Sequence, residues 1–181
     1  MTRIVPLEPP YPVDIQTHFD QVMRGKPPLL LFRTIARSER AWRKFRAGSL
    51  LDRGPLTLRQ REIVIDRTCF RTGCEYEWGV HVWIFAGAAR LADVEIHALG
   101  QLPFDAEGWR EDEAILVATV DALHERATLD DAEFVRLRFH FDEDQVLEIL
   151  MLAGFYRTVS YLANGLALPR EPDTPSFRDY A

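Results

Sequence analysis

Apolar residues recur at spacings of three and four along most of the chain. Ile15, Phe19, Val22 and Met23 show this spacing near the start, and it is typical of one face of an α-helix. No convincing strand appears in this pattern. Helices are predicted from residue 13 onward, including 38–51, 58–71, 74–89, 93–99, 111–126 and 130–137, with a long apolar helix after them. The pattern predicts an all-α domain of about seven to nine helices.

Local signals set several boundaries. Thr57 followed by Gln60 is a capping-box pattern that opens the helix over 58–71, and Gly73 is well placed to end it. Four prolines among the first twelve residues remove backbone donors and keep their neighbours extended. We therefore expect an N-terminal arm over 1–12, a single all-α domain over 13–168 and a C-terminal tail over 169–181.

The most apolar segment, residues 146–168, approaches the length that spans a membrane. It carries Glu148, Arg157 and Asn164, and its uncharged core over 149–156 is too short to cross a bilayer. Apolar residues occupy nearly every face, and a helix of this kind must be covered on all sides. The segment is predicted to be a buried helix that also meets a partner subunit, so we expect a homo-oligomer.

Charge and cysteine content narrow the function classes. The chain has 22 Lys and Arg against 28 Asp and Glu, for a formal charge of -6, which repels nucleic acid and anionic membranes. Neither is an expected partner. The two cysteines are only five residues apart, and the first residues lack an apolar signal core. These features predict a cytoplasmic protein without a disulfide scaffold.

The stretch "TGCEYEWGVH" (72–81) concentrates the candidate chemistry. At the start of a helix, the Cys74 sulfur would lie near free backbone amides, which lower a thiol pKa. Glu77 and His81 follow three and seven residues later, so the three side chains share one helical face. If the helices on either side of Gly73 pack as a hairpin, Glu62 can return beside His81 and orient its imidazole.

Other interpretations of these residues stay open. A helical cysteine is commonly a buried apolar residue, which is our interpretation of Cys69 and an equal alternative for Cys74. Tyr76 and Trp78 can be core aromatics. A zinc site of Cys69, Cys74 and His81 lacks a fourth ligand, so no metal and no cofactor is predicted. Surface or packing roles are expected for the remaining histidines, which are His18, His97, His124 and His140.

The run "LTLRQREIVIDRTCFRTGCEYEWGVHVWIFAGAARLADVEIHAL" resembles the core of the carboxymuconolactone decarboxylase family, which includes alkyl hydroperoxidase D-like proteins. The later segment "DEDQVLEILMLAGFYRTVSYLANGLALP" resembles the last long helix of that family. About three quarters of the chain takes part. The resemblance implies the all-α, oligomeric alkyl hydroperoxidase D-like fold.

In the alkyl hydroperoxidase D branch, the resemblance implies a glutamate, a Cys-x-x-Cys pair and a histidine. Glu62, Cys74 and His81 match the glutamate, the first cysteine and the histidine, and Tyr76 matches an intervening aromatic. Glu77 stands where the second, peroxide-attacking cysteine belongs. The implied enzyme is a peroxidase with Cys74 as its single redox-active thiol, His81 as base, Glu62 orienting His81, Glu77 and Tyr76 adjacent, and an external thiol as reductant.

The decarboxylase branch implies a different reaction. Loss of carbon dioxide from a lactone acid needs an acid or base for the developing dienolate but no thiol, and Glu77 and His81 are one helical turn apart. This lyase is the alternative hypothesis to the peroxidase. A third hypothesis is an oligomeric binding protein without catalysis.

Overall fold

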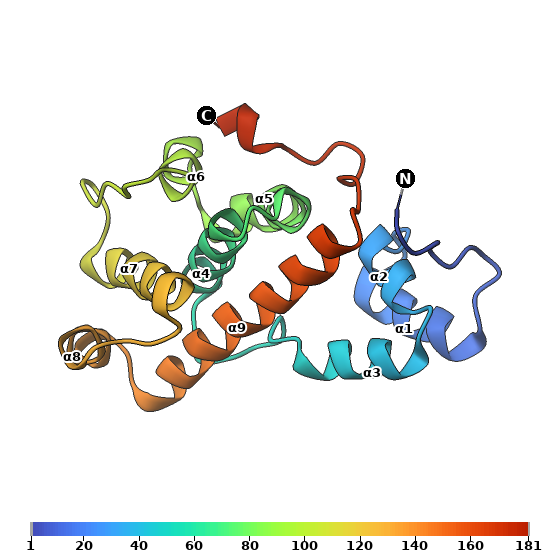
Figure 1. Cartoon of the computed structure of the whole chain (residues 1–181), viewed down its shortest axis with the longest axis horizontal. Helices are drawn as coiled ribbons and strands as arrows, with labels where there is room; N and C mark the ends of the chain where they lie inside the picture. Colours follow the sequence, from blue (N-terminus) through green and yellow to red (C-terminus); the bar gives the residue numbers. More distant parts are fainter. Residues whose placement is uncertain (1, 181) are drawn as a thin grey trace.

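The computed structural model describes residues 2–180, which form nine α-helices and a short 3-10 helix and contain no strand. Figure 1 shows their arrangement. The α-helices are α1 (Val13–Met23), α2 (Leu30–Ile35), α3 (Glu39–Gly48), α4 (Leu58–Arg71), α5 (Glu75–Ala89), α6 (Asp93–Leu99), α7 (Glu111–Arg126), α8 (Asp131–His140) and α9 (Glu143–Gly165), and the 3-10 helix is η1 (Phe177–Tyr180).

The all-α prediction is confirmed, and three predicted helices have the observed bounds: α4, α6 and α7. Three others differ at their ends. The helix expected over 74–89 begins at Glu75, with Cys74 as its N-cap. The helix expected over 38–51 ends at Gly48, because Ser49 adopts an extended conformation. The helix expected over 130–137 starts one residue later, after Asp130 caps it, and continues to His140.

Helix α4 is the centre of the domain and lies between α5, α7 and α9 (Figure 1). Its residues from Glu62 to Cys69 are all buried. A helix covered on all sides has no solvated face for its polar groups, so each of them must find a partner inside the protein. This burial is what places the polar residues of α4 in contact with the neighbouring helices.

The predicted capping box is present: Thr57 N donates to Gln60 Oε1 at 3.0 Å, and Gln60 N donates to Thr57 Oγ1 at 3.2 Å. Gly73 ends the turn after α4 with a left-handed φ of 62°, a conformation that glycine adopts without steric cost. Asn164 of α9 donates to the carbonyl of Thr72 at 3.1 Å. The turn therefore folds α5 back along α4.

Helix α9 is long and apolar enough to span a membrane by length and composition, with a mean hydropathy of 1.3. In this fold it packs on α4 and α5 through buried residues that include Ile149, Leu152 and Val159. Its outer face keeps Leu147 and Met151 more than half exposed. Self-association stays a prediction, and this face is the part of α9 that a partner subunit would cover.

The predicted tail packs along the outer face of α5 (Figure 1). The Phe177 ring lies 5.0 Å from the Trp78 ring, centroid to centroid. Gly79 permits this approach, because a Cβ at that position would lie 2.5 Å from the Pro175 carbonyl oxygen. The tail is thus part of the packed structure, although its sequence shows no helical pattern long enough to predict this.

Candidate active site

His81 lies at the centre of a buried polar cluster formed by α4, α5 and α9. Its Nδ1 is 2.7 Å from Glu62 Oε2, and its Nε2 is 3.0 Å from the hydroxyl of Tyr156. His81 and Glu62 are 2% and 1% exposed. The hairpin at Gly73 therefore brings Glu62 to the imidazole, as the sequence indicated it could.

Glu77 lies one helical turn before His81 on α5, and its Oε1 is 3.5 Å from His81 Nε2. Its second oxygen, Oε2, is buried and has no hydrogen-bond partner. Glu62 differs, because Arg61 Nε donates to its other oxygen at 3.1 Å. A buried carboxylate oxygen without a partner is uncommon and marks a group that can accept a proton or a ligand.

The imidazole is surrounded by negative charge. Burial alone lowers the pKa of His81, but the charges and hydrogen bonds of Glu62 and Glu77 outweigh it and raise the pKa to about 10. At neutral pH His81 is an imidazolium that donates from Nδ1 to Glu62. It can supply a proton from Nε2, which makes it an acid in this state and not a base.

The expected activation of Cys74 is wrong in this structure. Cys74 is the N-cap of α5 and is completely buried. Burial raises the pKa of its thiol to about 11, because the nearby Glu77 backbone amide and Ser160 hydroxyl offset only part of the cost of a buried thiolate. The helix start is present, but the loss of water outweighs it.

Two other candidates lie apart from the imidazole. Cys69 is buried inside α4 as expected, and burial holds its pKa well above the usual thiol value. The Tyr76 hydroxyl accepts from the Leu31 backbone amide at 2.9 Å and donates to Glu171 of the tail. Tyr76 therefore links α5 to α2 and to the tail and does not contact His81.

Sequence reasoning missed three residues of the cluster. Tyr156, on α9, contacts His81 directly and is 1% exposed. Ser160, one turn later, affects the pKa of Cys74 and donates to the Tyr156 carbonyl at 2.7 Å. Asp66 follows Glu62 by one turn of α4, and burial and then the charge of Glu62 raise its pKa well above the usual value. Its four-residue spacing from Glu62 was a usable signal, whereas an apolar run concealed Tyr156.

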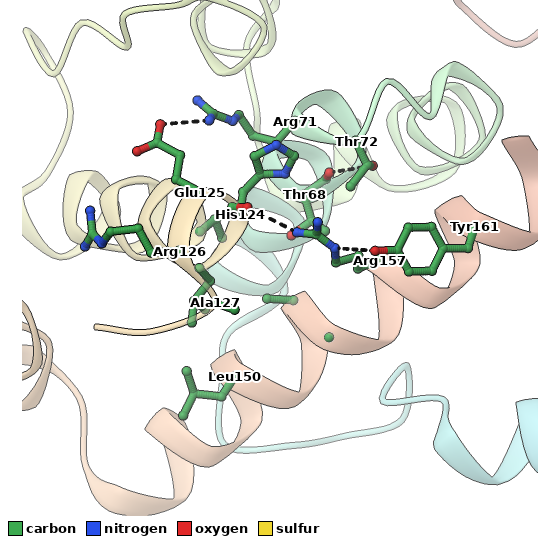
Figure 2. Close-up of a pocket in the computed structure, with 14 residues that line it drawn as sticks. Thr68, Arg71, Thr72, His124, Glu125, Arg126, Ala127, Leu150, Arg157 and Tyr161 are labelled. Carbon is green, nitrogen blue, oxygen red and sulfur yellow. Dashed lines mark hydrogen bonds and ion pairs between the residues drawn. The ribbon is translucent and has the colours of Figure 1, made fainter. Parts of the chain in front are cut away.

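Within residues 2–180, no group of three or more His, Cys, Asp or Glu side chains is arranged to hold a metal ion. A zinc site from Cys69, Cys74 and His81 does not form. A cavity between α4, α7 and α9, drawn in Figure 2, lies elsewhere and is lined by none of the residues that surround His81.

Solved structures of similar fold come from several bacteria. An uncharacterized peroxidase-related protein from Silicibacter sp. TM1040 has a TM-score of 0.80 at 18% identity, covering 98% of this chain and 96% of that one. An uncharacterized peroxidase-related protein from Ralstonia eutropha JMP134, described as an alkylhydroperoxidase AhpD core, has a TM-score of 0.83 at 20% identity, covering 95% and 93%. These TM-scores establish a shared fold.

Sequence comparison identifies the family. No curated protein matches the chain significantly. The model of the carboxymuconolactone decarboxylase family matches residues 36–125, which run from the end of α2 through most of α7 and include Glu62, Cys74, Glu77 and His81. The chain belongs to the carboxymuconolactone decarboxylase family.

Proposed function

We propose that the protein is a proton-transfer enzyme of the lactone-decarboxylase type, in which the His81 imidazolium acts as general acid. The observation that carries this proposal is the contact between Glu77 and His81 Nε2 at 3.5 Å. Glu77 stands where alkyl hydroperoxidase D-like proteins have their attacking cysteine. The position beside the histidine is thus occupied by a proton-transfer group and not by a thiol.

The proposed reaction needs only the groups of this cluster. A small lactone acid loses carbon dioxide when the bond to its carboxylate carbon breaks, and the bonding electrons remain as a dienolate. His81 Nε2 donates its proton to a carbon of that dienolate, and a proton from water restores the imidazolium. Glu62 holds the ring through Nδ1 and stabilises the charged form that donates.

Glu77 has two roles in this scheme. Its charge helps to keep His81 protonated, and its unpaired Oε2 can pass the replacement proton from water to Nε2. Glu77 is 6% exposed, more than either Glu62 or His81. We expect a substrate to enter the cluster from the side of this carboxylate.

A thiol peroxidase is the second candidate. The fold shared with peroxidase-related proteins favours it. It would require an external thiol reductant, because peroxide would leave a sulfenate on Cys74. Two features oppose this candidate. With a pKa of about 11, the Cys74 thiol forms very little thiolate at neutral pH. His81 is already protonated and cannot remove the thiol proton.

The variants Cys74→Ser and Glu77→Gln separate the two candidates. Each protein is assayed for carbon dioxide release from a small lactone acid and for consumption of an alkyl hydroperoxide with dithiothreitol as reductant. We expect Cys74→Ser to keep lyase activity and Glu77→Gln to lose most of it. Loss of all activity in Cys74→Ser alone would refute the proton-transfer mechanism. Inactivity of the wild-type protein in both assays would favour the binding protein.

A further inference from the structure

A cavity of about 610 Å³ opens between α4, α7 and α9 (Figure 2). Its volume is within the range of pockets that hold small organic ligands. The wall includes the polar side chains of Arg71, His124 and Arg157 and the apolar side chains of Val120, Leu123 and Leu150. The cavity is thus amphipathic.

Arg157 is the arginine of this cavity wall that has no carboxylate partner among the described residues. Its Nε donates to the Tyr161 hydroxyl at 2.8 Å, and one terminal nitrogen approaches the His124 carbonyl oxygen at 3.4 Å (Figure 2). Neither partner carries a negative charge, and no ion pair joins Arg157 to another of residues 2–180. A half-buried guanidinium without a carboxylate is a natural place for a planar anion, which can accept two parallel hydrogen bonds from it.

The other two arginines of the wall differ from Arg157. Arg71 pairs with Glu125 at 2.9 Å and lies 3.6 Å from Asp121, so part of its charge is already balanced. Arg126 holds Glu133 through both carboxylate oxygens, at 2.7 and 2.6 Å. Arg157 is therefore the principal anion contact, Arg71 a secondary one, and Arg126 is occupied elsewhere.

His124 is the third polar residue of this part of the wall. Its Nδ1 is buried and has no hydrogen-bond partner. Burial and then the charges of Arg71 and Arg157 lower its pKa, although Asp121 and Glu125 act in the opposite direction. The imidazole is thus a neutral group of the cavity wall near Arg71 and Arg157 (Figure 2), and it adds no negative charge that would compete with a bound anion.

We propose that this cavity is a binding site for a small organic carboxylate, whose charged group is held by Arg157 and whose apolar body lies against Val120, Leu123 and Leu150. The site is separate from the His81 cluster and does not depend on the reaction proposed for it. Thr72 nevertheless connects the two regions, because it lines the cavity and donates a hydrogen bond of 2.8 Å to Ser160, which in turn donates to the carbonyl of Tyr156.

The test is calorimetric titration of the full chain with benzoate, with benzamide as its uncharged analogue and inorganic phosphate as an anion without an apolar body. We expect benzoate to bind with one site per chain, and both benzamide and phosphate to bind at least about tenfold more weakly. Arg157→Gln should weaken benzoate by about tenfold, whereas Arg126→Gln should leave its affinity within about twofold.

A steric variant keeps every charged residue. Gly154 lines the cavity within α9, and a Cβ there would meet no atom within 4 Å. Gly154→Leu should therefore fold, fill the cavity and abolish benzoate binding. Gly87→Leu is the matched control, because Gly87 is also helical with open space at its Cβ but lies on α5 outside this cavity. It should bind benzoate as the wild type does.

Three results would overturn the proposal. The first is equal affinity for benzoate and benzamide, which would remove the role of charge. The second is equal affinity for benzoate and phosphate, which would remove the role of the apolar wall. The third is unchanged benzoate binding in folded Arg157→Gln or Gly154→Leu, which would place the ligand elsewhere on the protein.

Discussion

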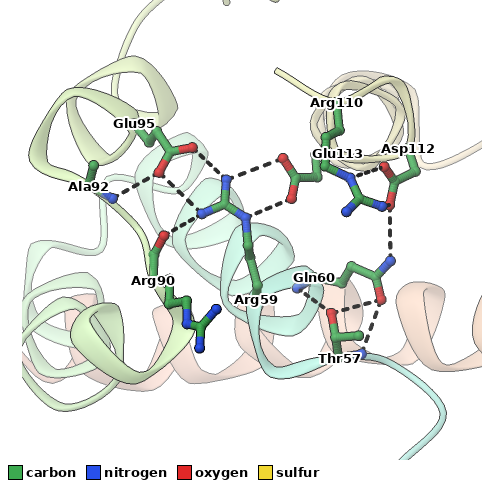
Figure 3. A network of polar contacts seen from close by, with 9 residues as sticks. All are labelled: Thr57, Arg59, Gln60, Arg90, Ala92, Glu95, Arg110, Asp112 and Glu113. Atoms are coloured by element: carbon green, nitrogen blue, oxygen red, sulfur yellow. Dashed lines mark hydrogen bonds and ion pairs between the residues drawn. The ribbon is translucent and has the colours of Figure 1, made fainter. Parts of the chain in front are cut away.

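Helix α4 takes part in two polar clusters of the same outline, each with a cationic side chain between two carboxylates. In its first turn, Arg59 lies between Glu95 of α6 and Glu113 of α7 (Figure 3). One turn later Glu62 meets His81, which also lies near Glu77. Both clusters place one cation between two carboxylates, but they are two different kinds of site.

The Arg59 cluster is complete. Arg59 makes five hydrogen bonds, to both oxygens of each carboxylate and to the Arg90 carbonyl (Figure 3). The hydrogen bonds with Glu113 and then Glu95 raise the pKa of the guanidinium further above its already high value. Its charge is permanent at any physiological pH and all its donors are used, so the cluster can only hold α4, α6 and α7 together.

The His81 cluster has the opposite properties. Its cation can lose a proton, its members are at most 6% exposed, and Glu77 Oε2 has no partner. A titratable cation beside an unpaired carboxylate can exchange protons with a substrate, which a saturated arginine cannot do. The comparison indicates that unused bonding capacity, and not charge density, distinguishes the candidate active site.

The largest expected effect is on activity, in His81→Gln. Glutamine keeps much of the volume and can still donate to Glu62, but it supplies no acidic proton. We expect lyase turnover to fall by about 10²- to 10⁴-fold, while the urea midpoint changes far less than activity does. Steady-state rates and urea unfolding of the same preparation measure both. Retained turnover in the folded variant would show that His81 is not the acid.

The second largest effect is expected on the stability of the variant Arg59→Met. Methionine fills similar space but leaves the carboxylate of Glu113, whose side chain is 4% exposed, without a cation. We expect the free energy of unfolding to fall by roughly 3 kcal/mol, measured by urea denaturation. Turnover per folded molecule should stay near that of the wild type. A specific loss of turnover without destabilisation would contradict the purely structural role of this cluster.

The sequence allowed the fold and half of the cluster to be predicted, because both depend on local signals. The capping box at Thr57 and the left-handed turn at Gly73 define the hairpin, and the hairpin brings Glu62 to His81. Glu77 follows from its four-residue spacing to His81. Each of these inferences needs only the geometry of one helix or of two consecutive helices.

Apart from Asp66, the parts that failed depend on distant segments. Tyr156 is 75 residues from His81, and nothing in an apolar run shows which hydroxyl will face the cluster. The pKa of Cys74 was expected to be low because of the helix start, but packing against α9 removes the thiol from water and reverses the direction. Local spacing predicted the helical face, but tertiary packing determined the burial that controls the chemistry.

The third expected effect is a pH dependence that the His81 cluster has and the Arg59 cluster lacks. His81 has a folded-state pKa of about 10, above its ordinary value of about 6.5. The stability from its ion pairs is fully present below pH 6.5 and is lost as the pH rises through 10. Lyase turnover should therefore fall by about tenfold for each pH unit above 10, whereas the Arg59 cluster keeps its charge throughout.

A pH profile of turnover and of the urea midpoint up to pH 11 is the measurement, with His81→Gln as the control that should lack this step in stability. A thiol-dependent reaction has the opposite slope, because the population of Cys74 thiolate increases towards its pKa of about 11. Turnover that rises between pH 8 and 11 would reject His81 as the acid and favour the peroxidase.

The smallest effect distinguishes the two carboxylates around Arg59. The Glu95 side chain is 27% exposed, so water already screens its attraction to Arg59. We expect Glu95→Gln to cost less than about 1 kcal/mol in the free energy of unfolding, and this cost should shrink further in about 0.5 M salt. Glu113→Gln should cost more and respond less to salt, because burial shields that pair from ions. Equal costs and equal salt responses in urea denaturation would show that burial does not separate the two contacts.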